Sequence, residues 1–308
     1  MKVFVTGGAG YLGSVLVGEL LATGHSVAVL DNFLYGQTSL LHLIGRGDLT
    51  IVCGDARDRR VMRPLLAHAD AVIPLACITG APACDADMSA AITTNFQAVR
   101  DLMADRSPSQ RLLFPNTNSG YGTGGDVPLT EDAPFRPQSL YAKLKTQAEQ
   151  VVLQHENTVS FRLATVFGPS PRMRLDLLVN DLVHRAVTEG VIVLYEPHFR
   201  RNYVHVRDVA ALFRWGLDGT PRHPVYNFGL SEANLTKRQL CEEIRRQVPR
   251  LRVLEASAMD HDRDRRDYLV DNARIEAEGM RAVIPLSQGI GELVEACEML
   301  RGRNHVNA

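Results

Sequence analysis

The sequence predicts an α/β fold, in which a doubly wound parallel sheet carries a smaller, mixed C-terminal lobe. Two features of the chain lead to this prediction. Through the first half, short apolar runs alternate with stretches in which apolar residues recur at helical spacing. After Gly168-Pro169 this rhythm breaks, and the later apolar runs are short and irregularly placed. Strands that alternate with helices form parallel sheets, because each crossover helix returns the chain to the same edge.

The expected elements follow from these runs in chain order. The first run, Val3-Phe4-Val5, ends at Gly7-Gly8 and predicts a buried strand. Sheet strands are expected at 3–5, 27–30, 49–53, 71–75, 111–114 and 159–163. Between them, helices are expected from Leu12 until Gly24, at 87–103 and at 139–154. Beyond the break, a helix is expected at about 175–189, with short strands at 191–194, 203–206 and 225–228.

Composition limits the classes of function. The 308 residues include 34 Lys+Arg and 35 Asp+Glu, a net charge of -1, so bulk charge attracts neither nucleic acid nor an anionic membrane. No apolar run approaches the roughly 18 residues that cross a bilayer, and the early glycine motif leaves no room for a signal peptide. The five cysteines form no CxxC pair, so neither a disulfide framework nor a metal site is expected. A cytoplasmic protein is predicted.

A glycine-rich turn joins the first predicted strand to the first predicted helix. The segment Thr6-Gly7-Gly8-Ala9-Gly10-Tyr11-Leu12-Gly13 has the glycine spacing of a dinucleotide-binding turn. Its glycines let the backbone approach a pyrophosphate, and the helix N-terminus supplies N–H groups and a partial positive charge. Contacts with such a cofactor are expected from Gly7, Gly10, Tyr11, Leu12 and Gly13.

Acidic residues at the ends of the second and third strands indicate which dinucleotide binds. Asp31 can accept hydrogen bonds from ribose hydroxyls and would repel a 2′-phosphate. Asn32 follows as a further candidate contact, and no arginine stands beside it to hold a phosphate. NAD is therefore predicted in preference to NADP. Asp55, with Ala56 after it, is placed either to meet the adenine amino group or to cap the next helix, and both interpretations stay open.

A Tyr-x-x-x-Lys pair lies on the helix predicted at 139–154. Tyr141 and Lys145 are four residues apart and share a helix face, so the ammonium can sit beside the hydroxyl and lower the tyrosine pKa. An unperturbed tyrosine, with a pKa near ~10, is a poor base at neutral pH. The same spacing is common on surface helices, so the pair gains meaning only with the rest of the chain. Thr117, which follows the fifth strand, can bridge this hydroxyl and a substrate hydroxyl.

Taken together, the glycine turn, Asp31, Asp55, Thr117 and the Tyr141–Lys145 pair resemble the extended short-chain dehydrogenase/reductase family. More narrowly, the chain is similar to the NAD-dependent nucleotide-sugar epimerases and dehydratases of that family. Further segments match in order: Leu75-Ala76, Asn95, Arg162 to Gly168-Pro169, 201–209 and 226–229. The resemblance implies a Rossmann-like NAD-binding domain of residues 1–169 plus about 203–230. It implies a substrate-binding lobe of 170–202 plus about 231–308.

The resemblance also implies roles for individual residues. Tyr141 would be the general acid and base, Lys145 its tuner and a ligand of the nicotinamide ribose, and Thr117 the partner of the substrate hydroxyl. Leu75 and Ala76 would line the cofactor. A nucleotide-diphosphate sugar would meet Thr117, Asn118, Arg172 and Arg201, together with one arginine from Arg263, Arg265 and Arg266, of which Arg263 is taken as the candidate. The family further implies a homodimer formed through the helices at 87–103 and 139–154.

Two departures from the family pattern bear on the reaction. Family dehydratases and decarboxylases carry an acid one or two positions after the strand-five Ser/Thr, where this chain has Asn118 and Ser119. Neither side chain is a proton donor of useful pKa, which argues against 4,6-dehydration. Cys77 follows the fourth strand, near the expected meeting point of nicotinamide and sugar. It is either a thiol acid/base or a small buried residue.

The sequence therefore predicts an NAD-dependent nucleotide-sugar epimerase, acting at C4 of a nucleotide hexose through a transient 4-keto intermediate, as UDP-glucose 4-epimerase does. Epimerisation needs only oxidation and re-reduction. The alternatives are a nucleotide-sugar reductase or dehydratase and a non-enzymatic NAD-binding regulator. Net consumption of NADH would identify the reductase, and the presence of both Tyr141 and Lys145 argues against the regulator. The nucleotide base, the sugar and the carbon attacked stay open.

Overall fold

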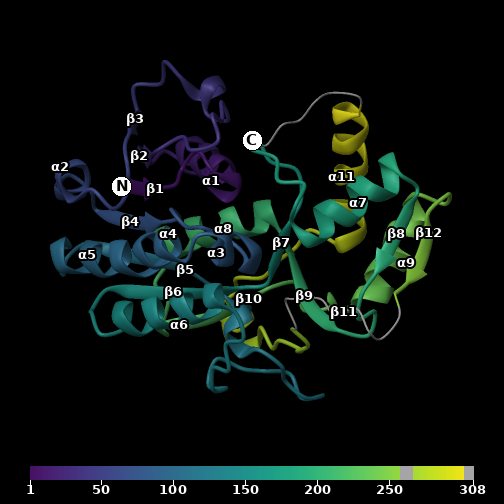
Figure 1. Ribbon diagram of the computed structural model, residues 1–308. Helices are drawn as coiled ribbons and strands as arrows, with labels where there is room; N and C mark the ends of the chain where they lie inside the picture. The colour runs from purple at the N-terminus through teal and green to yellow at the C-terminus, as the bar shows by residue number, and fades with distance from the viewer. Residues whose placement is uncertain (257–265, 302–308) are drawn as a thin grey trace.

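The computed structural model describes residues 1–256 and 266–301. Its centre is a seven-stranded sheet with the order β10-β6-β5-β4-β1-β2-β3, in which every neighbouring pair is parallel (Figure 1). The strands are β1 (Lys2–Thr6), β2 (Ser26–Asp31), β3 (Leu49–Cys53), β4 (Ala71–Pro74), β5 (Arg111–Thr117), β6 (Thr158–Leu163) and β10 (Val225–Phe228). The predicted doubly wound parallel sheet is confirmed.

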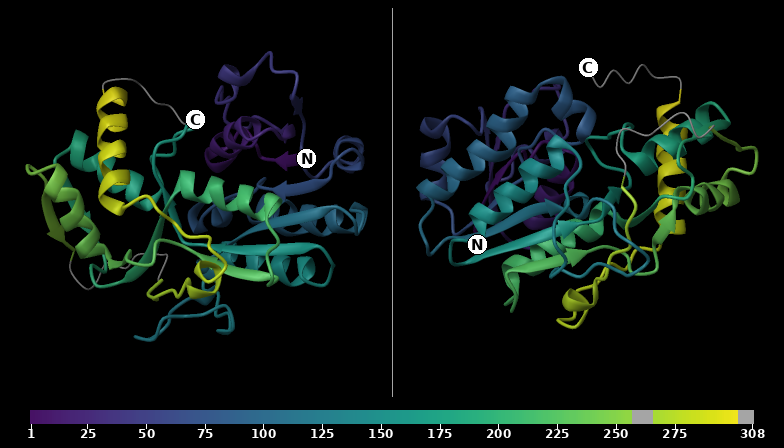
Figure 2. Two further views of the ribbon diagram at one scale, coloured as in Figure 1. Left: turned by 180° about the vertical axis from the view of Figure 1, so that it is seen from behind. Right: turned by 60° about the horizontal axis from the view of Figure 1, so that its bottom comes forward.

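Helices cover both faces of this sheet (Figures 1 and 2). One face packs against α1 (Tyr11–Ala22) and α8 (Val206–Asp218), and the other against α2 (Arg59–Ala67), α5 (Ala98–Asp105) and α6 (Leu140–Val152). A strand enclosed in this way is buried on both faces, and β6 is buried along its whole length, with its polar residues Ser160 and Arg162 included. Such enclosure explains why most of these strands contain a largely apolar run.

The strand order reverses between β1 and β4. The chain moves outward from β1 to β3, then crosses to β4 and moves outward to β10 on the other side. In open parallel sheets, ligands bind in the crevice at such a reversal, beyond the carboxyl ends of the strands. The glycine turn follows β1 and Thr117 ends β5, so both lie at this edge of the sheet.

The helix predicted at 87–103 is interrupted by a π-helical turn. It consists of α4 (Met88–Ile92), the turn η2 (Thr93–Gln97) and α5. The turn carries Asn95, whose side chain accepts the Ile78 N–H and donates to the Ile78 carbonyl, both at 2.8 Å. A π turn re-aims side chains and is frequent at functional sites. Here it fixes the loop after β4, at the sheet edge where the cofactor is expected.

The C-terminal lobe holds a three-stranded sheet, β11-β9-β7, and a two-stranded sheet, β12-β8. Its elements are β7 (Thr165–Phe167), α7 (Leu178–Thr188), β8 (Val191–Leu194), β9 (Arg200–His205), β11 (Asn234–Thr236), α9 (Lys237–Gln247), β12 (Arg252–Glu255) and α11 (Leu286–Leu300). Short helical segments elsewhere are η1 (Leu41–Leu43), α3 (Ala81–Ala86), η3 (Asn118–Tyr121) and α10 (Ala273–Glu276). The strand predicted at 203–206 starts earlier, at Arg200, because it pairs with β11. Within 1–256 and 266–301, no helix is long and apolar enough to span a bilayer.

A buried polar network joins β5, α6 and β6. The Glu149 carboxylate accepts hydrogen bonds from Arg162 at 2.8 Å, Asn116 at 2.6 Å and Ser160 at 2.5 Å. Arg162 also donates to the Tyr121 hydroxyl at 2.9 Å. The Arg162 and Glu149 side chains are 8% and 1% exposed, so this ion pair is shielded from water. The network fixes α6, the helix that carries Tyr141, against the centre of the sheet.

His205 is expected to make folding stability depend on acidic pH. Its Nδ1 accepts the Arg207 N–H at the start of α8, and its Nε2 lies 3.3 Å from the Glu292 carboxylate. Burial lowers the pKa of His205 to about 4, Arg207 lowers it further, and Glu292 opposes the shift. In the unfolded chain the ordinary pKa of ~6.5 applies, so the unfolded state binds the proton more readily. Stability is therefore lost as pH falls from about 6.5 towards 4.

The variant His205→Asn removes this titration while keeping a side-chain acceptor for the start of α8. We expect the Tm of the wild type to fall more steeply than that of the variant as the pH is lowered through this range. Thermal unfolding at successive pH values measures both slopes. Parallel slopes would show that another group is responsible.

Candidate functional site

The glycine turn between β1 and α1 has the shape that a bound pyrophosphate requires. Gly7 is in the left-handed region (φ +71°), and a Cβ added there would lie 2.6 Å from the Ala76 nitrogen. At Gly13 an added Cβ would overlap the Gly7 carbonyl oxygen. Helix α1 starts after Gly10 without a side-chain cap, which leaves its first N–H groups to a ligand. These residues fit the phosphates of a dinucleotide.

Asp31 is buried and ties the glycine turn to the end of β2. Its carboxylate accepts the N–H groups of Ala9 and Phe33, each at 2.9 Å, and the Gln37 side-chain amide at 3.1 Å. Each carboxylate oxygen can accept more than one donor, so Asp31 can still bind ribose hydroxyls. Asn32 is exposed, and its side-chain oxygen accepts the Leu34 N–H at 3.1 Å. The arrangement fits a ribose and opposes a 2′-phosphate.

Asp55 caps no helix, so that interpretation is wrong. Helix α2 begins at Arg59, and its cap is Asp58, which accepts the Arg60 N–H. Asp55 instead binds Arg57, whose Nε donates at 2.9 Å. The hydrogen bond from Arg57 lowers the pKa of Asp55 below its ordinary value. An ionised acceptor at this position suits the adenine amino group. The contact of Asp55 with adenine stays a prediction, and so does the contact of the half-buried Ala56 with the cofactor.

The end of β4 lies against the glycine turn. The Leu75 N–H donates to the Thr6 carbonyl at 2.9 Å, and the Ala76 N–H donates to the Thr6 hydroxyl at 3.3 Å. The next residue, Cys77, points its thiol at the Ile78 carbonyl, 3.5 Å away. Burial raises the pKa of the Cys77 thiol, although the nearby Lys145 opposes the shift. Cys77 is half-buried, and the choice between a thiol acid/base and a small packing residue stays a prediction.

Tyr141 and Lys145 lie on the first turns of α6, as predicted. Ser139 caps this helix by accepting the Ala142 N–H at 3.3 Å. Lys145 is 4% exposed, its Nζ lies 4.2 Å from the centre of the Phe114 ring, and burial lowers its pKa. In the described part of the chain, no hydrogen bond joins its ammonium to the Tyr141 hydroxyl. The role of Lys145 as the group that tunes Tyr141 stays a prediction.

The surroundings of Tyr141 favour its protonated form. Burial raises the pKa of Tyr141, and the neighbouring Cys77 adds to the rise. The cations that oppose the shift are Arg266 and Arg174, both from the C-terminal half of the chain. Sequence reasoning expected Lys145 in this role. The electrostatics of Tyr141 thus depend on arginines from the C-terminal half of the chain.

Thr117 and Asn118 form the corner at the end of β5. The Thr117 hydroxyl oxygen accepts the Ser119 N–H at 3.1 Å and lies 2.9 Å from the Ser119 hydroxyl oxygen. Asn118 is fully buried, and its side-chain oxygen and nitrogen find no hydrogen-bond partner among the described residues. Leaving such an amide unpaired costs about 1–3 kcal/mol. Because Asn118 exposes no surface in this structure, its contact with the substrate stays a prediction.

Two arginines act on Tyr203, and one of them contacts this corner. Arg201 is 3% exposed on β9, and it and Arg266 both lower the pKa of Tyr203, which burial raises. Arg266 also donates a hydrogen bond from Nη1 to the Ser119 hydroxyl. Of the three arginines left open by the sequence, Arg263 and Arg265 lie outside the described residues. Arg266, which the structure describes, lies at this corner through its contact with Ser119.

Arg172 lies towards the cofactor end of the crevice. It is 9% exposed, its guanidinium lies 4.7 Å from the centre of the Tyr35 ring, and the charge of Asp31 acts on it. Tyr35 follows β2, whereas Arg172 follows β7, so the contact bridges the two sides of the crevice. Arg174, two residues later, is paired with Asp176.

We expect the Tyr35–Arg172 contact to slow the release of NAD. A cation–π contact contributes ~0.5–2 kcal/mol, so Arg172→Ala should speed dissociation roughly 2- to 30-fold. Stopped-flow fluorescence of NADH displacement measures the rate. Arg60→Ala, which removes an exposed arginine from α2, is the matched control and should change nothing. Equal release rates for wild type and Arg172→Ala would show that the Tyr35–Arg172 contact does not slow the release of the cofactor.

Sequence reasoning missed Asn180, which links the glycine turn to the C-terminal lobe. It lies buried on α7, where its side chain accepts the Gly168 N–H at 3.1 Å and donates to the Arg174 carbonyl at 2.9 Å. The same amide donates to the Tyr11 hydroxyl at 3.3 Å. The available signal was a polar residue inside an apolar helix stripe. Tyr35, also missed, gave no signal beyond its place in a loop.

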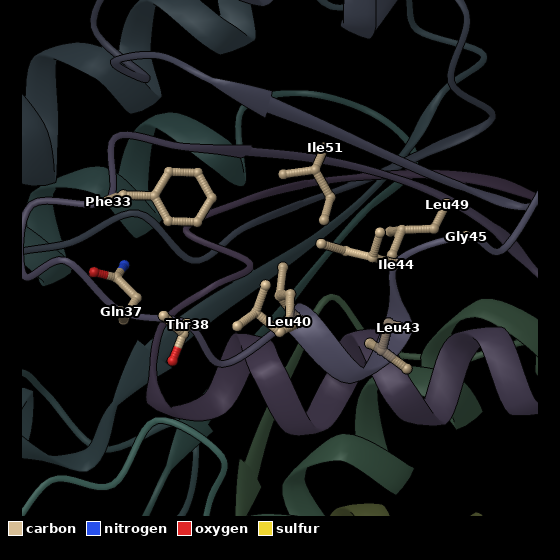
Figure 3. Close-up of a pocket in the computed structure, with 10 residues that line it drawn as sticks. Phe33, Gln37, Thr38, Leu40, Leu43, Ile44, Gly45, Leu49 and Ile51 are labelled. Atoms are coloured by element: carbon tan, nitrogen blue, oxygen red, sulfur yellow. The ribbon is translucent and has the colours of Figure 1, made fainter.

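A cavity of about 410 Å³ lies apart from the corner at Thr117, between the segment after β2 and strand β3 (Figure 3). Its lining is largely apolar: Phe33, Gln37, Thr38, Leu40, Leu41, Leu43, Ile44, Gly45, Leu49 and Ile51. Because Gln37 also binds Asp31, the cavity adjoins the expected ribose site. Across 1–256 and 266–301, no group of three or more His, Cys, Asp or Glu side chains is placed to hold a metal ion.

Comparisons with known proteins agree with this geometry. The model of the NAD dependent epimerase/dehydratase family matches residues 3–229. The low-salt glycan biosynthesis protein Agl12 of Haloferax volcanii is 27% identical over 311 residues, which cover 96% of this chain and 97% of that protein. The dTDP-glucose 4,6-dehydratase of Streptomyces niveus is 26% identical over 314 residues, covering 96% and 92%. The crystal structure of Thermus thermophilus UDP-glucose 4-epimerase with NAD matches with a TM-score of 0.82 at 25% identity, covering 97% of this chain and 99% of that one. The chain therefore belongs to the NAD dependent epimerase/dehydratase family, as an enzyme whose cofactor is NAD.

Proposed function

We propose that this enzyme epimerises a nucleotide hexose at C4 through a transient 4-keto sugar. The observation that carries the proposal is the corner at the end of β5. It is built from the hydroxyl of Thr117, the amide of Asn118 and the hydroxyl of Ser119, and none of these is an acid that could assist loss of water. Oxidation followed by re-reduction needs no such acid. The Thermus thermophilus relative, a UDP-glucose 4-epimerase, supports the same reaction class.

The residues of this chain would divide the work as follows. Bound NAD supplies a hydride acceptor that can return the hydride to the opposite face of the sugar. The glycine turn and Asp31 hold the cofactor, and Lys145 would bind its nicotinamide ribose. Tyr141 takes the proton of the sugar hydroxyl during oxidation and gives it back during re-reduction. Thr117 would bind the same sugar oxygen. Because the proton and the hydride are both returned to the sugar, no atom is gained or lost overall.

The C-terminal half of the chain would bind the nucleotide diphosphate. Arg201 and Arg266 are buried or half-buried cations that lie close together beside Tyr203. Guanidinium groups suit phosphate because their N–H donors match its oxygens. Arg174 is a third candidate, since its charge already acts on Tyr141. We therefore place the diphosphate between the C-terminal lobe and the crevice at β1 and β4.

The proposed setting is a homodimer in the cytoplasm. The exposed Met88 and Ile92 on α4 support an interface through the paired helices α4–α5 and α6, because large apolar side chains on one helix suit burial against a second copy. Light scattering of the wild type and of Met88→Asp tests this interface. A dimer that the substitution leaves intact would contradict it.

A panel of UDP-, GDP-, dTDP- and CDP-hexoses tests the reaction class. We expect one of them to be converted to its 4-epimer, with unchanged mass by mass spectrometry and a new sugar configuration by NMR. A product lighter by one water would assign a dehydratase instead. Stoichiometric oxidation of added NADH by a 4-keto sugar, over many turnovers, would assign a reductase.

A further inference from the structure

We propose that Ser119 and Arg266 are positioning residues that turn the Thr117 hydroxyl into a fixed hydrogen-bond donor for the sugar oxygen. This inference rests on the proposed function, because it assigns how Thr117 meets the reacting hydroxyl. It is carried by three contacts at the end of β5: Arg266 to Ser119, Ser119 to Thr117 through the hydroxyls, and Ser119 to Thr117 through the backbone.

Arg266 determines which group donates in each of these hydrogen bonds. A guanidinium has only donors, so the Ser119 oxygen must be the acceptor in the first contact. Ser119 is 2% exposed, so its own proton cannot turn to water. Among the described residues, the one acceptor found within reach of that proton is the Thr117 hydroxyl oxygen, 2.9 Å away. The nearby cation also polarises the serine hydroxyl and makes it a better donor.

Thr117 is thereby left with one remaining hydrogen-bonding role. A hydroxyl oxygen has two lone pairs and one proton. The Ser119 N–H at 3.1 Å and the Ser119 hydroxyl at 2.9 Å occupy the two acceptor positions. Thr117 itself is only half-buried, so its proton can point out of the protein towards the crevice. A fixed donor there would stabilise the negative charge that develops on the sugar oxygen while Tyr141 removes its proton.

Arg266 is held in place by its neighbour in the chain. Asp267 forms an ion pair with Arg200 on β9 at 2.9 Å, and its carbonyl accepts the Gly124 N–H at 2.8 Å. The adjacent Tyr268 donates its N–H to the Arg200 carbonyl at 3.2 Å. We call the hydrogen-bond series from Arg266 through Ser119 to Thr117 the relay. The C-terminal part of the chain fixes Arg266, the first donor of the relay, whereas its last residue, Thr117, belongs to the central sheet.

A double-mutant cycle separates a relay from a purely structural role. We expect Thr117→Ala to slow reduction of bound NAD by saturating nucleotide sugar roughly 10- to 150-fold, and Ser119→Ala roughly 2- to 10-fold. Because Ser119 acts through Thr117, adding Ser119→Ala to Thr117→Ala should have no further effect. Stopped-flow absorbance at the nicotinamide band gives each rate. The matched control is Ser109→Ala, an exposed serine in the loop before β5.

Two outcomes of the cycle overturn the relay. One is an unchanged rate in Ser119→Ala, and the other is a Ser119→Ala effect that persists in the Thr117→Ala background. If the wild type reduces its NAD with none of the sugars, the proposed function fails instead.

A neutron structure of the deuterium-exchanged protein then tests the relay without any substrate. The relay requires the Ser119 deuteron to point at the Thr117 oxygen and the Thr117 deuteron to point into the crevice. A Thr117 deuteron that points at Ser119 would overturn it.

Discussion

Tyr141→Phe is expected to lower turnover by ~10²-fold or more while NAD binding stays intact. The substitution removes the hydroxyl that we propose moves the sugar proton, and it keeps the aromatic ring at the start of α6. Turnover is measured with the nucleotide hexose that the panel identifies, and NAD binding by calorimetry. Tyr195→Phe, at an exposed tyrosine of the C-terminal lobe, is the matched control. Near-normal turnover of Tyr141→Phe would show that the acid–base assignment is wrong.

The same variant should lose the alkaline dependence of the oxidation step. Burial raises the pKa of Tyr141, so at neutral pH the hydroxyl is protonated and only a minor fraction is able to accept a proton. The rate of NAD reduction by the sugar should therefore rise with pH in the wild type. In Tyr141→Phe the residual rate should be flat over the same range. A rising rate in both proteins would assign the base to another group.

Arg162→Met is expected to destabilise the fold by about 3–5 kcal/mol, because it leaves the Glu149 carboxylate buried without its cation. Urea unfolding monitored by circular dichroism measures the change. The double variant Glu149→Leu/Arg162→Met removes both charges and should be less destabilised than the single variant. A single variant within ~1 kcal/mol of the wild type would mean that Asn116 and Ser160 alone satisfy the carboxylate. That result would contradict the role given to the ion pair.

Much of the sheet could be predicted from sequence because its signals are local. Most strands of the central sheet contain a short, largely apolar run, and the runs at 191–194 and 225–228 coincide with β8 and β10. The glycine turn is recognisable because Gly7 and Gly13 leave no room for a Cβ. These features depend on the backbone and on burial, both of which leave a pattern along the chain.

What the sequence could not show depends on packing between distant segments. The π turn within 87–103 carries Asn95, whose side chain binds the backbone of Ile78. Sequence alone does not show that these two residues meet. The helix spacing predicts that Lys145 shares a face with Tyr141, but it could not show that the Lys145 ammonium lies over the Phe114 ring. Sequence alone could not decide whether Asp55 caps the next helix or meets the adenine, because the cap at Asp58 and the pairing of Asp55 with Arg57 appear only in the fold. The contact of Arg266 with Ser119 joins segments far apart in the chain, so sequence alone could not predict it.

The most direct test of C4 epimerisation follows a label at the reacting carbon. A nucleotide hexose carrying deuterium at C4 is incubated with the wild-type enzyme in ordinary water, and both sugars are examined by NMR and mass spectrometry at equilibrium. If hydride leaves C4 and returns to the opposite face, the deuterium is retained at C4 in substrate and in epimer, and the mass is unchanged. Deuterium lost to solvent, found at another carbon of the sugar or accumulated on released cofactor would contradict the proposed reaction.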